Sequence, residues 1–231
     1  MTDDADEPVQ RTVRIGITGP IGCGKSTVAS WLGERTGVSI LDADDVSRDV
    51  LAPGTAELSA VLGRFGAGLA RDDGSLDRAA LGHIVFSDPS ALRDLEAIVH
   101  PAVRIRILAA LRAAEARGDR AIVIEAIKLV EGGLAELCDE VWLVACDPAA
   151  QLQRLLGRGS DAGDAQARIA AQGDLVSRLT PQATRIIDTS DGLDATRATV
   201  DAALTAALAG PARRVQPAEW RDDGPPGDPS R

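Results

Sequence analysis

Residues 19–27 read Gly-Pro-Ile-Gly-Cys-Gly-Lys-Ser-Thr, and this stretch decides the fold. Its first eight residues fit the P-loop pattern G-x-x-x-x-G-K-[ST], whose glycines let backbone N–H groups turn inward around a phosphate at a helix N-terminus. The lysine of the pattern reaches the β- and γ-phosphates of a nucleotide, and the next hydroxyl binds Mg²⁺. A glycine-rich turn could match by chance, but the apolar run before this stretch and the helical pattern after it favour nucleotide binding.

We therefore expect Mg-ATP as the cofactor, with Ser26 as the protein's ligand to the metal. The expected nucleotide-binding residues are Gly19, Ile21, Gly22, Cys23, Gly24, Lys25, Ser26 and Thr27. Lys25 is one of only two lysines among 25 basic residues, the other being Lys128, so each is expected where arginine cannot serve.

Apolar runs at 13–18, 38–41, 121–124, 141–145 and 184–188 predict strands, and helical patterns lie between them. Strands that alternate with helices indicate an α/β protein with a parallel sheet. We expect a three-layer P-loop NTPase fold over 12–209, with a helical substrate-binding insertion at about 46–118 and a lid at about 154–172. Pro101 is expected to kink or restart the helix after His100. Residues 1–11 and 210–231 are expected to form a disordered and a flexible tail.

Composition narrows the functional classes. The net charge of −10 argues against a general nucleic-acid binder, since phosphate backbones require a basic surface. No stretch reaches the length of about 20 apolar residues that a membrane span requires. The three cysteines have no CxxC spacing and are odd in number, which favours a reduced, cytoplasmic protein.

Acidic residues follow the second and third predicted strands, at the sheet edge where ligands of such folds bind. Asp42 and Asp44 are two apart, so in an extended segment both carboxylates would face the same cleft. The alternative is that Asp44 or Asp45 caps a helix that begins at Val46. Glu125 ends the third strand in the manner of a Walker-B acid.

Charged residues that follow these strands have two interpretations each. Glu131 lies six residues after Glu125, with Lys128 between them, and the alternative here is a solvated loop with a local ion pair. Arg154 and Arg158 are four apart and therefore on one helix face, just before a glycine-rich loop. They are candidate lid cations for the phosphates, and the alternative is an exposed basic face.

A P-loop alone does not define the reaction. The N/T-K-x-D motif of GTPases and the LSGGQ-like signature of ABC ATPases are both absent from the sequence. A small-molecule kinase requires an acid near the γ-phosphate to orient the acceptor hydroxyl, and cations that close over the transferred group. The acids and arginines above supply candidates for both.

These segments, in this order, resemble those of the dephospho-CoA kinases over about residues 12–209. The resemblance rests on TGPIGCGKST, LDADDVSRDVLAPGT, RFG, DGSLDRAALGHIVFSDPSALRDLEAIVHP, LQRLLGR and ARIAAQ. It implies ATP-dependent phosphorylation of the ribose 3′-hydroxyl of dephospho-CoA, the last step of coenzyme A synthesis. It also implies Asp44 as the catalytic base, with Lys25, Arg154 and Arg158 acting on the phosphates.

The same resemblance places the acceptor on the helical section. The candidate substrate residues are Asp42, Pro53, Arg78, His100, Glu125, Lys128 and Glu131. The sequence departs from the family at 125–131, where D-x-P-L-L-x-E is usual and this chain has EAIKLVE. We hypothesise that Lys128, which replaces an apolar residue, reaches the substrate's phosphates or holds Glu125 or Glu131 in place.

Two other functions stay open on the sequence. One is a P-loop kinase that phosphorylates a nucleoside or nucleotide, which a substrate screen separates from the first interpretation. The other is a nucleotide-binding regulatory protein that has lost catalysis, against which the intact Lys25, Ser26 and Asp44 argue. We expect a small-molecule substrate, dephospho-CoA, with no nucleic-acid or membrane partner, and a monomer or small homo-oligomer.

Overall fold

The apolar runs form strands close to the bounds that the sequence predicts. The computed structural model describes residues 11–210, and its strands are β1 Val13–Thr18, β2 Val38–Asp42, β3 Ala121–Glu125, β4 Glu140–Ala145 and β5 Arg185–Asp188. They form one sheet in the order β2-β3-β1-β4-β5, and every pairing is parallel. The predicted α/β fold with a parallel sheet is confirmed.

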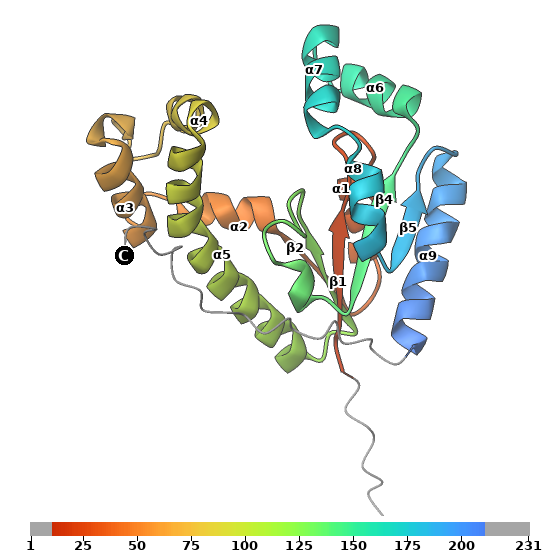
Figure 1. Cartoon of the computed structure of the whole chain (residues 1–231). Helices are drawn as coiled ribbons and strands as arrows, with labels where there is room; N and C mark the ends of the chain where they lie inside the picture. The colour runs from red at the N-terminus through yellow and green to blue at the C-terminus, as the bar shows by residue number, and fades with distance from the viewer. Residues whose placement is uncertain (1–10, 211–231) are drawn as a thin grey trace, which may run out of the picture.

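Alternate side chains of strand β3, which lies between β2 and β1, enter two different cores, as the period of a strand requires. Ile122 and Ile124 pack with helices on one face of the sheet, while Ala121 and Val123 pack on the other. The first face is covered by the long helix α5 (Pro89–Arg117), and the second by α1 (Lys25–Gly33) and α9 (Leu193–Ala209) (Figure 1). The sheet is therefore the middle of three layers.

Two groups of helices extend from this sandwich. The first group consists of α2 (Ala43–Val50), α3 (Ala56–Phe65), α4 (Arg78–Ser87) and α5, and lies to the left in Figure 1. We call it the acceptor half, after the substrate-binding insertion that the sequence predicts. The second group has α6 (Pro148–Gly157), α7 (Ala162–Gln172) and α8 (Leu175–Leu179), and we call it the lid, after the lid predicted at about 154–172. In Figure 1 α6 and α7 lie beyond the end of the sheet toward which the strand arrows point.

The expectation that the helix restarts at Pro101 is wrong. Helix α5 runs without interruption from Pro89 to Arg117 and contains Pro101 in its interior. A proline there removes one backbone hydrogen bond, at a cost of about 3 kcal/mol. Buried Val99, Val103 and Ile107 lie on either side of it in the core, and their burial offsets that loss.

Both chain ends extend beyond the described part. The tails predicted at 1–11 and 210–231 fall almost wholly outside residues 11–210, although Arg11 is described and forms an ion pair with Asp139. Within residues 11–210, no helix has the length and apolar character needed to cross a membrane.

Candidate active site

The P-loop connects β1 to α1, and two of its residues have backbone conformations that favour glycine. Gly19 has a φ of 142°, and a Cβ there would lie 2.1 Å from the carbonyl oxygen of Val144. Gly24 has a φ of 91° and directly precedes the first turn of α1. The loop therefore takes the conformation that turns backbone N–H groups toward a phosphate at a helix N-terminus.

Lys25 is held inside this loop. Its ammonium donates to the carbonyl oxygens of Gly19 at 2.9 Å and Pro20 at 3.0 Å, and its residue is only 8% exposed. Burial lowers the pKa of Lys25, and the negative charges of Glu125 and Asp44 partly oppose that shift. The ammonium is therefore hydrogen-bonded to the P-loop backbone, and two carboxylates act on it electrostatically.

Asp42 at the end of β2 and Asp44 on α2 make different contacts. The structure therefore corrects both the extended segment and the helix cap that the sequence suggested here. Helix α2 begins at Ala43 rather than Val46, and Asp42 is its N-cap, accepting from the backbone N–H groups of Asp44 at 2.8 Å and Asp45 at 3.2 Å. The predicted cap residues are therefore wrong by two or three positions, and Asp44 is helical rather than extended. The Asp42 carboxylate caps the helix, whereas the Asp44 carboxylate, on the first turn of α2, does not and is available to a substrate.

Asp44 sits where its proton affinity is raised. Burial is the main cause that raises the pKa of Asp44, and the negative charge of Asp42 adds to it, while Arg48 and Lys25 act in the opposite direction. A carboxylate of raised pKa that interacts electrostatically with the P-loop lysine is suited to accept a hydroxyl proton.

Glu125 and Ser26 meet across the sheet edge. The Ser26 hydroxyl donates to a Glu125 carboxylate oxygen at 2.7 Å, and strand pairing places Asp42 directly opposite Glu125. Burial raises the pKa of Glu125, and the charges of Asp42 and Asp44 raise it further, although the Ser26 hydrogen bond lowers it. The acids that the sequence predicts for the site and Ser26, the predicted metal ligand, thus lie in one cluster.

The lid arginines differ in their connections. Arg154 donates to both the hydroxyl, at 2.8 Å, and the carbonyl of Thr189, and the Thr189 hydroxyl lies 2.8 Å from the Cys23 carbonyl of the P-loop. Arg158 follows the end of α6 as its C-cap, and its positive charge lowers the pKa of Lys25. Arg154 is therefore connected to the P-loop through Thr189, whereas Arg158 affects Lys25 through its charge.

Two glutamines were missed as functional residues by sequence reasoning. The backbone N–H of Ile21 donates to the Gln172 side chain at 2.9 Å, and the Ile21 carbonyl accepts from Gln151 at 2.8 Å. Gln151 is 7% exposed. The sequence carried no signal for either glutamine, because both lie more than a hundred residues from Ile21 along the chain. The lid helices α6 and α7 are thereby fastened to the P-loop backbone.

The predicted reduced state of the cysteines is wrong for one pair. Cys23 of the P-loop and Cys146 after β4 form a disulfide, with Cα atoms 5.2 Å apart. The strand order explains why the sequence did not reveal this pair, because β4 lies next to β1 in the sheet although 123 residues separate the two cysteines. Cys138 is a free, buried thiol, and burial raises its pKa to about 12.

The residues after β3 lie at the acceptor half. The Lys128 ammonium pairs with Glu96 of α5 at 3.3 Å, rather than with the Glu125 or Glu131 that the sequence suggested. His100 lies one helical turn beyond Glu96 on α5 and is exposed. Glu131 is exposed in the turn that follows β3. The structure thus brings Lys128 close to the helix that carries His100.

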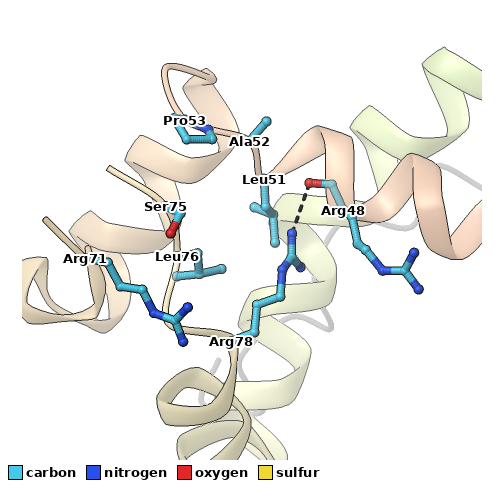
Figure 2. A pocket seen from close by; sticks show the side chains of 8 residues that line it. All are labelled: Arg48, Leu51, Ala52, Pro53, Arg71, Ser75, Leu76 and Arg78. Atoms are coloured by element: carbon cyan, nitrogen blue, oxygen red, sulfur yellow. Dashed lines mark hydrogen bonds between the residues drawn. The ribbon is translucent and has the colours of Figure 1, made fainter. Parts of the chain in front are cut away.

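Pro53 and Arg78 share a cavity at the other end of α2. Its lining includes Arg48, Leu51 and Leu76 as well, and Figure 2 shows Arg78 reaching up to the carbonyl oxygen of Arg48. This cavity is one helical turn from Asp44 along α2. Two of the candidate substrate residues, chosen from separate sequence segments, therefore line one space.

A parallel sheet of this order, with a P-loop after its first strand, acids at the neighbouring strand ends and arginines on a lid, defines the class of P-loop kinases. The family model described as dephospho-CoA kinase matches residues 13–194. The chain belongs to that family.

Individual relatives agree with this assignment. A dephospho-CoA kinase of Symbiobacterium thermophilum is 46% identical over 197 residues, which are 85% of this chain and 82% of that relative. The crystal structure of TT1252 from Thermus thermophilus superposes with a TM-score of 0.71 at 31% identity, covering 84% of this chain and 97% of that one. A dephospho-CoA kinase from Campylobacter jejuni has a TM-score of 0.63 at 25% identity, with coverages of 84% and 96%.

Proposed function

We propose that this protein transfers the γ-phosphate of Mg-ATP to the ribose 3′-hydroxyl of dephospho-CoA, forming coenzyme A. The observation that carries the proposal is the position of Asp44 on the first turn of α2, after a strand of the P-loop sheet, where its carboxylate and the Lys25 ammonium act on each other electrostatically. Membership of the dephospho-CoA kinase family supports the choice of acceptor.

Each charged residue has a proposed part in the transfer. Asp44 accepts the proton of the 3′-hydroxyl as its oxygen attacks the γ-phosphorus in line with the leaving oxygen of ADP. Lys25, Arg154 and Arg158 neutralise the charge on the transferred group, in a site where fixed charges act more strongly than in water. Closure of the lid on the P-loop excludes water, which would otherwise compete with the acceptor.

Mg²⁺ is part of this proposal, and the residues present fit it. Within residues 11–210 no group of three or more His, Cys, Asp or Glu side chains forms a metal cage. Mg²⁺ is usually held by one or two protein oxygens together with phosphate oxygens of the nucleotide, so Ser26 and Glu125 suffice as its protein ligands. Held by these two residues, the ion would neutralise negative charge that develops on the phosphates during transfer.

The acceptor residues remain proposals. Pro53 and Arg78 are proposed for the cavity at the end of α2, and His100, Lys128 and Glu131 for the surface that α5 and the turn after β3 provide. Asp42 and Glu125 are proposed to act through the backbone and the metal, respectively. We also infer an enzyme without a nucleic-acid partner, which the net charge of −10 supports. A cytoplasmic location and a monomer or small homo-oligomer stay part of the proposal, although the Cys23–Cys146 disulfide removes the argument from reduced cysteines for that location.

A coupled ADP-release assay tests the proposed function. Mg-ATP is supplied with dephospho-CoA, adenosine, AMP, uridine or no acceptor. We expect turnover of roughly 1 per second or more with dephospho-CoA alone. Turnover with a nucleoside or nucleotide instead would favour the alternative kinase, and no phosphoryl transfer to any acceptor would favour the regulatory protein.

A further inference from the structure

The cavity between the end of α2 and the start of α4 gathers positive charge in a chain of net charge −10. It has a volume of about 360 Å³, and three arginines are among its lining residues, Arg48, Arg71 and Arg78. Small-molecule sites typically have volumes of roughly 300–1,000 Å³. Both its size and its charge are therefore suited to part of an anionic ligand.

Arg78 has most of its hydrogen-bonding capacity unused. Its guanidinium donates one hydrogen bond, to the carbonyl oxygen of Arg48 at 3.0 Å (Figure 2). Within residues 11–210 it forms no ion pair with a carboxylate. A guanidinium has five N–H donors in a planar fork that matches phosphate oxygens, so Arg78 can bind a phosphate and keep its structural hydrogen bond.

Arg71 is the second cation of the cavity and is only loosely paired. It lies 3.5 Å from Asp77, whose carboxylate also accepts from the backbone N–H of Ala80 at the start of α4, and Asp73 is a further nearby acid. The Arg71 side chain is 56% exposed, and exposed ion pairs of this kind stabilise a protein by about 0–1 kcal/mol. A bound phosphate can therefore replace Asp77 at little cost.

Of the three arginines, only Arg71 and Arg78 are oriented to bind a ligand in the cavity. Figure 2 shows the Arg71 and Arg78 side chains entering the cavity, whereas the guanidinium of Arg48 points away from both, toward the side where it pairs with Asp45. The apolar wall is formed by Leu51 and Leu76, which are 5% and 4% exposed. Apolar walls focus the field of nearby charges and so strengthen the attraction for an anion.

The cavity lies within a short distance, along α2, of Asp44, the proposed catalytic base. Arg48, whose carbonyl holds Arg78, lies one helical turn after Asp44, a rise of about 6 Å. In dephospho-CoA the 5′-diphosphate is separated from the 3′-hydroxyl only by the ribose ring and its exocyclic methylene. An acceptor whose 3′-hydroxyl meets Asp44 can therefore reach the cavity with its diphosphate.

We propose that Arg71 and Arg78 bind the 5′-diphosphate of the acceptor and make it a requirement for recognition. This inference rests on the proposed function, and it identifies the diphosphate as the part of the acceptor that the protein recognises. Adenosine, which carries the same 3′-hydroxyl without the diphosphate, is accordingly a poor ligand.

Calorimetry with dephospho-CoA tests the two arginines without requiring turnover. We expect Arg78→Gln to raise the Kd for dephospho-CoA by at least about tenfold and Arg71→Gln by about threefold, because a bidentate phosphate contact is the stronger one. The Kd for ATP stays within about twofold in both variants, since the P-loop is unchanged. Arg112→Gln, which removes an equal charge from an exposed position of α5, is the matched control and leaves both constants unchanged.

A pair of ligands that differ in the diphosphate identifies what the arginines bind. With a non-hydrolysable ATP analogue bound, ADP-ribose should bind the wild-type protein at least about tenfold more tightly than adenosine, and this ratio should fall below about threefold in Arg78→Gln. An equal ratio in both proteins would overturn the inference. So would an unchanged Kd for dephospho-CoA in both arginine variants. An inactive wild-type protein that still binds dephospho-CoA through Arg78 would instead refute the proposed function alone.

Discussion

The donor half and the acceptor half of the cleft are built in different ways. The donor half consists of the P-loop, the lid and Thr189, and its polar residues are buried: Lys25 is 8% exposed, Gln151 7% and Thr189 4%. Each of them hydrogen-bonds to backbone atoms of the P-loop. The acceptor half and the turn after β3 next to it present long, exposed side chains, such as Lys128 in that turn, whose side chain is 64% exposed and has one ionic contact.

We infer that this difference in burial follows from the ligand proposed for each half. The triphosphate of a nucleotide is recognised by backbone N–H groups, whose positions the fold itself determines. An acceptor is recognised by its shape and charge, and exposed side chains can adopt conformations that complement both. We therefore expect changes on the donor side to affect stability as well as catalysis, and changes on the acceptor side to affect mainly the KM of one substrate.

The largest effect is expected at Asp44, where the two halves meet. Asp44→Asn removes the base and keeps the shape, so kcat should fall by about 10²–10⁴ while the Kd for ATP is unchanged. Rapid kinetics and nucleotide calorimetry measure the two quantities. Asp49→Asn, an equal change at an exposed position on the same helix, is the control. Full turnover by Asp44→Asn would remove Asp44 from the chemistry.

The disulfide between Cys23 and Cys146 should make the donor half contribute to the stability of the fold. Cys146→Ser opens a covalent link across 123 residues and should lower the free energy of unfolding by about 2–5 kcal/mol. Denaturant unfolding with and without dithiothreitol measures this. The reductant should destabilise the wild-type protein and leave Cys146→Ser unaffected. Equal stability of the two proteins under oxidising conditions would show that the link does not stabilise the native state.

A change on the acceptor surface should have a narrower consequence. Lys128→Ala should raise the KM for dephospho-CoA about tenfold, equivalent to about 1.4 kcal/mol, if the ammonium contacts substrate phosphates. Its exposed pair with Glu96 contributes little to folding, so the melting temperature should stay the same. A KM equal to that of the wild type would exclude Lys128 from the acceptor site.

The smallest effect is a shift in pH dependence. Since burial and Asp42 raise the pKa of Asp44, activity should be lost as pH falls through a value above that of an ordinary aspartate, about 3.9. Asp42→Asn keeps a good N-cap but removes one negative charge, so the ionised form of Asp44 becomes easier to form. The acidic limb of kcat/KM should then move to lower pH by less than about one unit. A shift to higher pH would contradict this assignment of charges.

The donor half could be predicted from sequence because its residues form one continuous pattern. Residues 19–27, the strand before them and the helix after them are local features, and all were found where expected. The Asp42 cap was misplaced because a helix start is decided by two backbone hydrogen bonds, and Asp42, Asp44 and Asp45 are all good capping residues.

The remaining features depend on contacts between distant segments. The partner of Cys23 follows from the order of strands, and the glutamines that hold Ile21 lie 130 and 151 residues away. Arg71 was overlooked because a turn arginine beside two aspartates looks like a local ion pair. Only the fold brings Arg71 and Arg78 into one cavity with the end of α2.

The most direct test is the identity of the product. Dephospho-CoA is incubated with Mg-ATP and the protein, and the phosphorylated product is analysed by ³¹P NMR and chromatography against authentic coenzyme A. We predict a single new monoester phosphate on the ribose 3′-oxygen and an equal amount of ADP. A phosphate at another position, or ADP formed without any phosphorylated acceptor, would contradict the placement of the acceptor hydroxyl at Asp44.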